Sequence, residues 1–182
     1  MLRGPAHHAV CRLKIFSDFP DDVLAELDFV VASVHTSLRQ DTGQITRRVM
    51  NALRNPYVDV IGHPSGRILG QREESAVDLD AVIREAARTG TSLEVNSIPA
   101  RLDLDDAHVR RALELGVKVA INSDAHHPGG LESLSFGLAT ARRGWARATD
   151  VLNTMPLDEL RSWRKARIAQ QLASQEENHD AV

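Results

Sequence analysis

The chain has 182 residues, enough for one domain with a hydrophobic core, and 42% of them are apolar while 26% are charged. A formal net charge of -3 gives none of the overall basic character that is typical of nucleic-acid-binding proteins, so such binding would need a local basic patch. The single cysteine, Cys11, excludes an intrachain disulfide framework and a cysteine-cluster zinc site. Any bound metal must therefore have nitrogen and oxygen ligands.

Hydropathy gives no sign of membrane insertion or export. No apolar run in the sequence approaches the roughly 18 residues that a membrane-spanning helix requires. The first residues also lack the long apolar stretch of a signal peptide. We therefore expect a soluble, cytoplasmic protein with no membrane partner.

Helical and extended patterns alternate along the chain from residue 20 onward. Apolar periodicity and capping residues predict helices over residues 21–28, 42–55, 77–90, 103–116, 130–144 and 156–173. Apolar runs predict strands over residues 29–35, 57–64, 91–97 and 117–127. This alternation is typical of βαβ units in a parallel sheet, and the nearly continuous apolar strands fit a sheet that is covered on both faces. The polar end, residues 174–182, is expected to fray.

Metal-ligand residues follow three of the four predicted strands. They are His35, His63 and the pair Asp124 and His126. The carboxyl ends of parallel strands meet at one edge, which is the catalytic face of βα-barrels, and residues two apart in an extended segment point the same way. Imidazole nitrogen and carboxylate oxygen suit zinc, manganese or iron(II). We predict one divalent metal ion bound by these four residues, with Asp124 and His126 also serving in catalysis.

Such a metal favours hydrolysis, because it lowers the pKa of bound water towards about 7 and neutralises charge on phosphoryl oxygens. Arg67 and Arg101, in loops after the second and third strands, are predicted to bind substrate phosphate, since guanidinium groups suit that geometry. Glu94 and Asn96 end the third strand and are predicted to line the substrate pocket or to support the ligands. The structural alternative is that a lone strand-end histidine is only hydrogen-bonded, and we prefer a site because several such residues share one face.

Longer motifs resemble a known family, the PHP (polymerase and histidinol phosphatase) domain, and most closely its version at the C-terminus of bacterial family X DNA polymerases. The resemblance covers about residues 18–168 and rests on segments that read "SVH", "NPYVDVIGHPSGRILGQRE", "VDLDAVIREAARTGTSLEVNS", "RLDLDDAHVRRALELGVKVAINSDAHH" and "GLATARRGW". "GHPSGR" and "NSDAH" are fairly specific in combination. Residues 1–17 do not match, and residues 169–182 form a polar tail.

The resemblance implies a distorted (β/α)7 TIM-like barrel with up to three metal ions, commonly zinc or manganese. It also implies phosphoesterase chemistry and, in the polymerase-linked branch, a 3′–5′ exonuclease that processes DNA 3′ ends in repair. By motif, His35, His63, Asp124 and His126 match family metal ligands, whereas Glu94 matches a pocket position. The expected substrate is a DNA 3′ end or a small phosphate ester, and the rest of a family X polymerase is an expected partner.

The chain departs from the family pattern at its start. The family's N-terminal H-x-H motif, a further histidine and a glutamate in a "GIEV"-like strand are absent from this sequence. We therefore expect an α/β fold that is a partial barrel lacking the first strands, with ligands for one ion. Three alternatives to an active exonuclease remain. They are a catalytically inactive remnant, a histidinol-phosphatase-like enzyme, and a binding module that holds phosphate or DNA with Arg67, Arg72 and Arg101.

Overall fold

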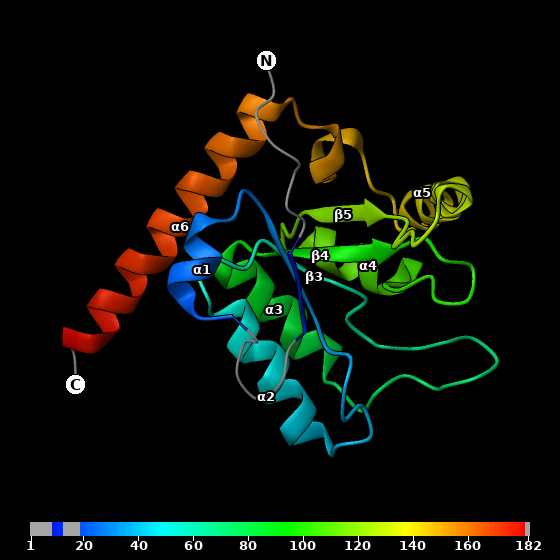
Figure 1. Cartoon of the computed structure of the whole chain (residues 1–182), viewed down its shortest axis with the longest axis horizontal. Helices are drawn as coiled ribbons and strands as arrows, with labels where there is room; N and C mark the ends of the chain where they lie inside the picture. Colours follow the sequence, from blue (N-terminus) through cyan, green and yellow to red (C-terminus); the bar gives the residue numbers. More distant parts are fainter. Residues whose placement is uncertain (1–8, 13–18, 181–182) are drawn as a thin grey trace.

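A computed structural model describes residues 9–12 and 19–180 of the chain. Five parallel strands form one sheet in the order β1-β2-β3-β4-β5, so each strand pairs with its neighbours in sequence (Figure 1). The strands are β1 (Ala9–Arg12), β2 (Val30–Ser33), β3 (Val60–Ile61), β4 (Ser92–Asn96) and β5 (Val119–Asn122). All four predicted strands are confirmed, although β3 pairs over only two residues.

Helices connect the strands and continue after the last one. They are α1 (Asp21–Glu26), α2 (Thr42–Leu53), α3 (Leu79–Thr89), α4 (Asp106–Glu114), α5 (Leu134–Arg143) and α6 (Leu157–Asp180), with 3-10 turns η1 (Pro128–Ser133), η2 (Ala148–Asp150) and η3 (Leu152–Thr154). An aspartate caps the N-terminus of α2, α3 and α4, and each carboxylate accepts a backbone N–H three residues on. Gly90 ends α3 in the left-handed conformation that the sequence predicts for a C-cap.

The α/β class is confirmed, and the barrel stays a prediction. Among the described residues the named strands form an open sheet in which β1 and β5 lie at opposite edges. β1 falls inside the segment 1–17 that does not match the family, and it pairs in parallel with β2. The remaining residues of that segment lie outside the described part of the chain.

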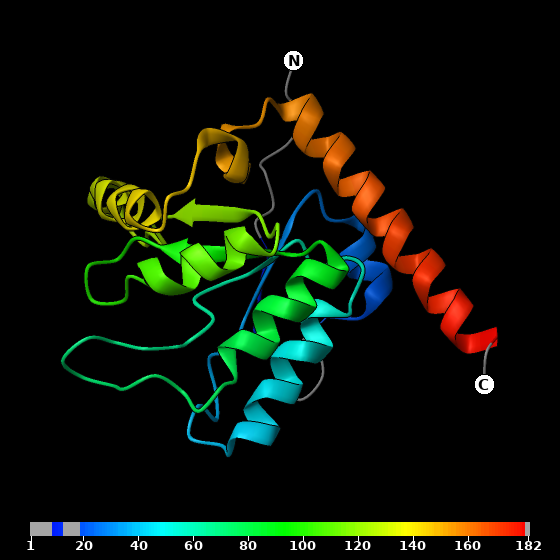
Figure 2. The same cartoon turned by 180° about the vertical axis from the view of Figure 1, so that it is seen from behind.

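Two apolar clusters cover the two faces of the sheet. Helices α2, α3 and α4 pack against one face, and the larger cluster buries residues such as Ile61 and Val119 there. Adjacent residues in the same strands, Val60 and Ala120, belong to a smaller cluster together with Leu152. Since consecutive strand residues point to opposite faces, the second cluster lies on the other side of the sheet. Figure 2 shows α2 and α3 side by side and α6 running along the outside of the molecule.

The polar C-terminal segment is helical, so the expectation that residues 174–182 fray is wrong as far as Asp180. Two glutamines of α6 hold it against the ends of neighbouring helices. Gln171 Nε2 donates to the backbone oxygen of Thr89 at 2.8 Å, and Gln175 Nε2 donates to that of Arg54 at 2.8 Å. These bonds satisfy carbonyls at the C-terminal ends of α3 and α2, which explains why a polar segment stays ordered. Within the described residues, no helix has both the length and the apolar character needed to cross a membrane.

Candidate functional site

Three of the predicted ligands meet at the C-terminal edge of the sheet. His35 follows β2, His63 follows β3 and Asp124 follows β5. The rings of His35 and His63 lie edge to face with their centroids 5.0 Å apart. The Asp124 carboxylate is close enough to His63 for its charge to oppose the lowering of the histidine pKa. Arg101 also belongs to this group, with its Nε 3.9 Å from Asp124 Oδ2.

A buried network of one carboxylate and two amides lies beneath these residues. Glu94 is 4% exposed, and its Oε2 accepts the backbone N–H of His63 at 2.6 Å. The side-chain amides of Asn96 and Asn122 donate to the two oxygens of Glu94 at 3.2 Å and 2.9 Å. Burial raises the pKa of Glu94 to about 7, while these hydrogen bonds act in the opposite direction. Glu94 and Asn96 thus lie behind the exposed surface, and their predicted contact with substrate stays a prediction.

The turns that carry His63 and Asp124 have left-handed backbone conformations. Their φ angles are +30° and +49°, in a region that side chains with a Cβ rarely adopt. Such conformations cost on the order of 1–3 kcal/mol and persist where the surrounding structure enforces them, which is common at functional sites. Gly62, just before the first turn, lets the chain pass close to β2, because a Cβ there would lie 2.4 Å from Ser33 Oγ.

His63 is a neutral imidazole at pH 7. Burial lowers the pKa of His63 to about 4, and the positive charge of Arg101 and the neighbouring ring of His35 act in the same direction. Its Nδ1 is buried and has no hydrogen-bond partner among the described residues. A neutral imidazole with an unused ring nitrogen can accept a proton or bind a metal ion.

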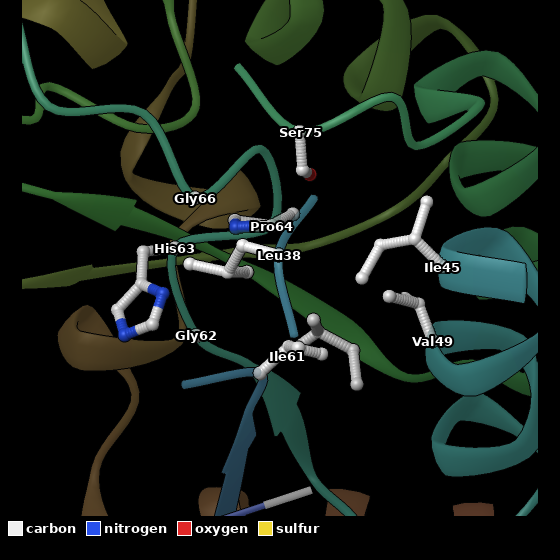
Figure 3. Close-up of a pocket in the computed structure, with 10 residues that line it drawn as sticks. Leu38, Ile45, Val49, Ile61, Gly62, His63, Pro64, Gly66 and Ser75 are labelled. Carbon is white, nitrogen blue, oxygen red and sulfur yellow. The ribbon is translucent and has the colours of Figure 1, made fainter. Parts of the chain in front are cut away.

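A small apolar pocket lies behind the His63 turn (Figure 3). Its volume is about 10 Å³, room for one water molecule, and α2 contributes Ile45 and Val49 to its wall. Figure 3 shows the ring of His63 directed away from these two side chains. The pocket is therefore a gap in packing behind the turn, and a substrate would have to approach the ring from its other side.

Two buried charged residues that the sequence reasoning missed hold the site loops. Arg48 is 6% exposed, and its Nη1 donates to the Thr36 backbone oxygen at 2.8 Å and to Gln40 Oε1 at 3.0 Å. It thereby fixes the loop after His35. The available signal was its position, because residue 48 falls on the buried stripe of α2.

Asp103 has the corresponding role for the loop after His63. Its carboxylate accepts the backbone N–H groups of Ser65 and Gly66 at 3.0 Å and 2.9 Å. Burial raises the pKa of Asp103 to about 6, and the bonds from Ser65 and Gly66 oppose that shift. A buried charged side chain from another segment thus bonds to the backbone of each histidine loop.

The predicted phosphate-binding arginines differ in their surroundings. Arg67 Nε donates to the backbone oxygen of Arg101 at 2.7 Å, and its Nη2 donates to that of Leu102. Arg72 donates twice to the Gly66 carbonyl. These two guanidinium groups tie loops together, whereas Arg101 has an ionic contact at the site itself, with Asp124. A substrate role for Arg67 and Arg101 stays a prediction.

His126 lies in the exposed turn after Asp124. Its Nδ1 is 2.8 Å from the backbone oxygen of Asp124, so the ring folds back on its own turn. Across residues 9–12 and 19–180, no three histidine, cysteine, aspartate or glutamate side chains are grouped closely enough to hold a metal ion. The donor types present still suit a divalent cation, and the unused Nδ1 of His63 is consistent with a ligand role. The four-ligand metal site stays a prediction.

Comparison with known proteins gives relatives of two kinds, while no protein-family model matches the chain. Over 148 residues, 81% of this chain and 26% of the relative, it is 43% identical to the DNA polymerase/3′-5′ exonuclease PolX of Bacillus subtilis. Over 118 residues, 60% of this chain and 46% of the relative, it is 34% identical to a probable phosphatase of Thermoanaerobacter sp.. A probable phosphatase of Clostridium acetobutylicum is 28% identical over 118 residues, with the same shares of both chains.

The chain spans about a quarter of the length of the PolX relative and just under half of these phosphatases. The names of the relatives describe a DNA polymerase with a 3′-5′ exonuclease and probable phosphatases. They support a family relationship of the PHP-like kind that the motifs suggest.

Proposed function

We propose that this chain contributes a metal-dependent phosphoesterase of the PHP type, with residues 18–168 as the C-terminal part of its domain. The proposed substrate is the 3′ end of DNA, processed as by a 3′–5′ exonuclease, in association with polymerase segments of the family X kind. The 43% identity to a protein named as a polymerase and 3′–5′ exonuclease supports this choice.

One observation carries the proposal. The side chains of His35, His63 and Asp124 come from the ends of three different strands and gather at one edge of the sheet. Two of the three sit on left-handed backbone, held by buried hydrogen bonds. Left-handed backbone also occurs at Ser37, Leu102 and Trp145, so the gathering of the three side chains supports the proposal more than the turns do.

A divalent ion such as Zn²⁺ or Mn²⁺ would be held by His35, His63, Asp124 and His126, and it would supply charge neutralisation and hydroxide near neutral pH. The low pKa of His63 favours ligation, because only a neutral imidazole can donate an electron pair to a metal ion. Asp124, on the same edge of the sheet, adds the negative charge that a divalent cation prefers.

The remaining chemistry is assigned to residues of the chain itself. Arg101 binds a phosphoryl oxygen, because its guanidinium group lies 3.9 Å from Asp124 and can form two parallel hydrogen bonds. Arg67 positions Arg101 by bonding to its backbone carbonyl. His126, exposed beside Asp124, is the fourth residue that would hold the ion, and the proton for the leaving oxygen comes from water. Cleavage then gives a hydroxyl on one product and a phosphate on the other.

A small phosphate ester is the second candidate substrate. The probable phosphatases among the relatives favour it, since the match to each of them spans 60% of this chain. An ester of this kind would use the same residues and would differ only in what lies beyond the phosphate. Comparing the two substrates on one preparation therefore decides between an exonuclease and a histidinol-phosphatase-like enzyme.

The test uses the purified chain with Mn²⁺ or Zn²⁺, a 3′-labelled DNA strand and p-nitrophenyl phosphate. We expect about one metal equivalent per chain and hydrolysis of at least one substrate, and we expect Asp124→Ala to abolish both. Asp158→Ala, an exposed change on α6, is the matched control and should leave both unchanged. Full hydrolysis by Asp124→Ala would overturn the proposal. DNA binding that EDTA does not affect, without hydrolysis, would support the metal-free binding module instead.

A further inference from the structure

We infer that Asn96 is a positioning residue that couples the turn of His63 to the turn of Asp124 through Glu94. The inference deepens the proposed function and rests on it for its consequence in catalysis. The coupling itself is argued only from hydrogen bonds within the folded chain. It gives a role to a fully buried amide of β4 that touches neither solvent nor the small apolar pocket.

The side chain of Asn96 is fixed by bonds on both ends of its amide. Nδ2 donates to Glu94 Oε2 and to Asp124 Oδ2, each at 3.2 Å. Oδ1 accepts the backbone N–H of Ile98 at 3.1 Å, which settles which end of the amide faces the carboxylates. The residue is 0% exposed, so water cannot replace these bonds without a change in the surrounding packing.

An amide suits this position for a chemical reason. Two carboxylates approach the same point, and the NH₂ group offers one hydrogen to each while carrying no charge. A serine hydroxyl has a single hydrogen, and an aspartate would add a third set of acceptor oxygens. Asparagine is therefore the short neutral side chain that bridges both acids and also accepts a backbone N–H.

The bridge continues from Glu94 to the other turn. Glu94 Oε2, the oxygen that accepts from Asn96, also accepts the backbone N–H of His63 at 2.6 Å. An unbroken line of hydrogen bonds thus runs from the backbone of His63, through Glu94 and Asn96, to the side chain of Asp124. Since both end residues have positive φ angles, the same line restrains two strained turns at once.

Among substitutions of the described residues, the loss of Asn96 should free the Asp124 side chain most. The other contact of this carboxylate is Arg101, whose Nε is 3.9 Å away. Partners that orient metal ligands in this way typically change metal affinity by about 10–100-fold when removed. A role confined to packing in β4 would instead lower stability and leave the two turns independent of each other.

The first experiment needs no enzymatic activity. In ¹H–¹⁵N spectra of the metal-free chain, Asn96→Ala should move the backbone amide signals of both His63 and Asp124. Asn153→Ala is the matched control, because Asn153 also serves β5, by accepting the Ile121 N–H, and lies outside the network. It should leave the His63 signal in place. An Asn96→Ala spectrum in which the His63 amide does not move would overturn the inference.

Asn96→Leu keeps a side chain of similar size, adds no charge beside Asp124 and gives a second variant if the alanine form does not fold. It should move the same two amide signals, because it removes the bridging NH₂ group. Titration with Mn²⁺ alone then measures the consequence, and both variants should bind about 10–100-fold more weakly than the unaltered chain. Wild-type affinity in both folded variants would overturn the inference.

The two proposals fail in different ways. If the unaltered chain hydrolyses no phosphate ester, the proposed function is wrong, and the amide signals still decide whether Asn96 couples the turns. If the chain is active and Asn96→Ala alters neither the His63 signal nor the Mn²⁺ affinity, the proposed function stands and the coupling is wrong.

Discussion

Both ends of the parallel sheet carry a carboxylate with cationic neighbours, but the surroundings of the two carboxylates differ. At the N-terminal end, Asp59 is fully buried and is bonded to Arg164, Arg167 and the backbone N–H of Val30. At the C-terminal end, the side chain of Asp124 is 28% exposed, with one amide donor and a cation 3.9 Å away.

The difference separates structure from function. Asp59 joins the start of β2 and β3 to α6, two segments more than 100 residues apart, and its oxygens are used within the protein. Asp124 and the Nδ1 of His63 keep unused bonding capacity beside the surface, on backbone that is strained. Three guanidinium nitrogens of Arg164 and Arg167 also lack hydrogen-bond partners among the described residues, so the contrast rests on the exposure of Asp124 and on the strained turns, which are common at functional sites.

The largest expected effect is a loss of stability at the N-terminal end of the sheet, where Asp59 is buried. Asp59→Ala leaves Arg164 and Arg167 without their counter-charge, and removing one partner of a buried ion pair costs about 3–5 kcal/mol. The free energy of unfolding from urea denaturation measures this. Asp158→Ala, whose partner Arg161 lies 4.0 Å away on the surface of α6, should change it by less than about 0.5 kcal/mol. Equal losses in the two variants would contradict a structural role for the Asp59 cluster.

The next largest effect concerns Arg48, which holds the loop that carries His35. Arg48→Met removes the donors to Thr36 and Gln40 while keeping the apolar stem, and we expect a loss of about 2 kcal/mol. The freed loop should also weaken Mn²⁺ binding, since it carries His35. Arg47→Met is the control on the same helix, because Arg47 is exposed. Unchanged stability in Arg48→Met would show that the loop needs no such anchor.

A smaller effect concerns pH at the start of α4. The His108 ring, which hydrogen-bonds to Asp105, lowers the pKa of Asp105 to about 2, and this bond in turn raises the pKa of His108. A lowered carboxyl pKa adds stability that is lost as pH falls from about 4 towards 2. A raised histidine pKa adds stability that is lost as pH rises through the folded-state pKa, above 6.5.

Asp105→Asn removes the charge that Asp105 presents to His108 and to Arg67 Nη1, 3.5 Å away, while asparagine still caps the helix. The variant should lose about 0.5 kcal/mol between pH 4 and 6 and less above that range, where only the contact with Arg67 retains opposite charges. Thermal melting across pH measures the difference. A loss that is the same at every pH would mean that the cap matters and the ion pair does not.

The smallest expected effect on stability concerns Asp124, at the C-terminal end of the sheet. Asp124→Asn should change the free energy of unfolding by no more than about 0.5 kcal/mol, because asparagine tolerates left-handed backbone and can still accept from Asn96. Metal binding should nevertheless fall sharply, since one negative charge is lost. A destabilisation as large as that of Asp59→Ala would place Asp124 among the structural residues.

Local patterns in the sequence determined much of the fold. Apolar spacing and the C-cap glycine Gly90 predicted helices, because a helix needs a buried stripe and often ends in left-handed backbone, whereas the aspartate N-caps were identified only in the structure. Apolar runs predicted four strands, and their shared direction predicted that His35, His63 and Asp124 would meet. The fraying of residues 174–182 was predicted wrongly, because the glutamine bonds that order them come from helices distant in the sequence.

Only the tertiary structure decided how those side chains are held. The left-handed turns, the low pKa of His63 and the bridge through Asn96 depend on distances between residues about 30 positions apart. The same holds for Arg48 and Asp103, whose charges are buried against loops of other elements. Periodicity records which face of an element is apolar, whereas hydrogen bonds across strands and the loss of water around a charge arise only when the elements pack together.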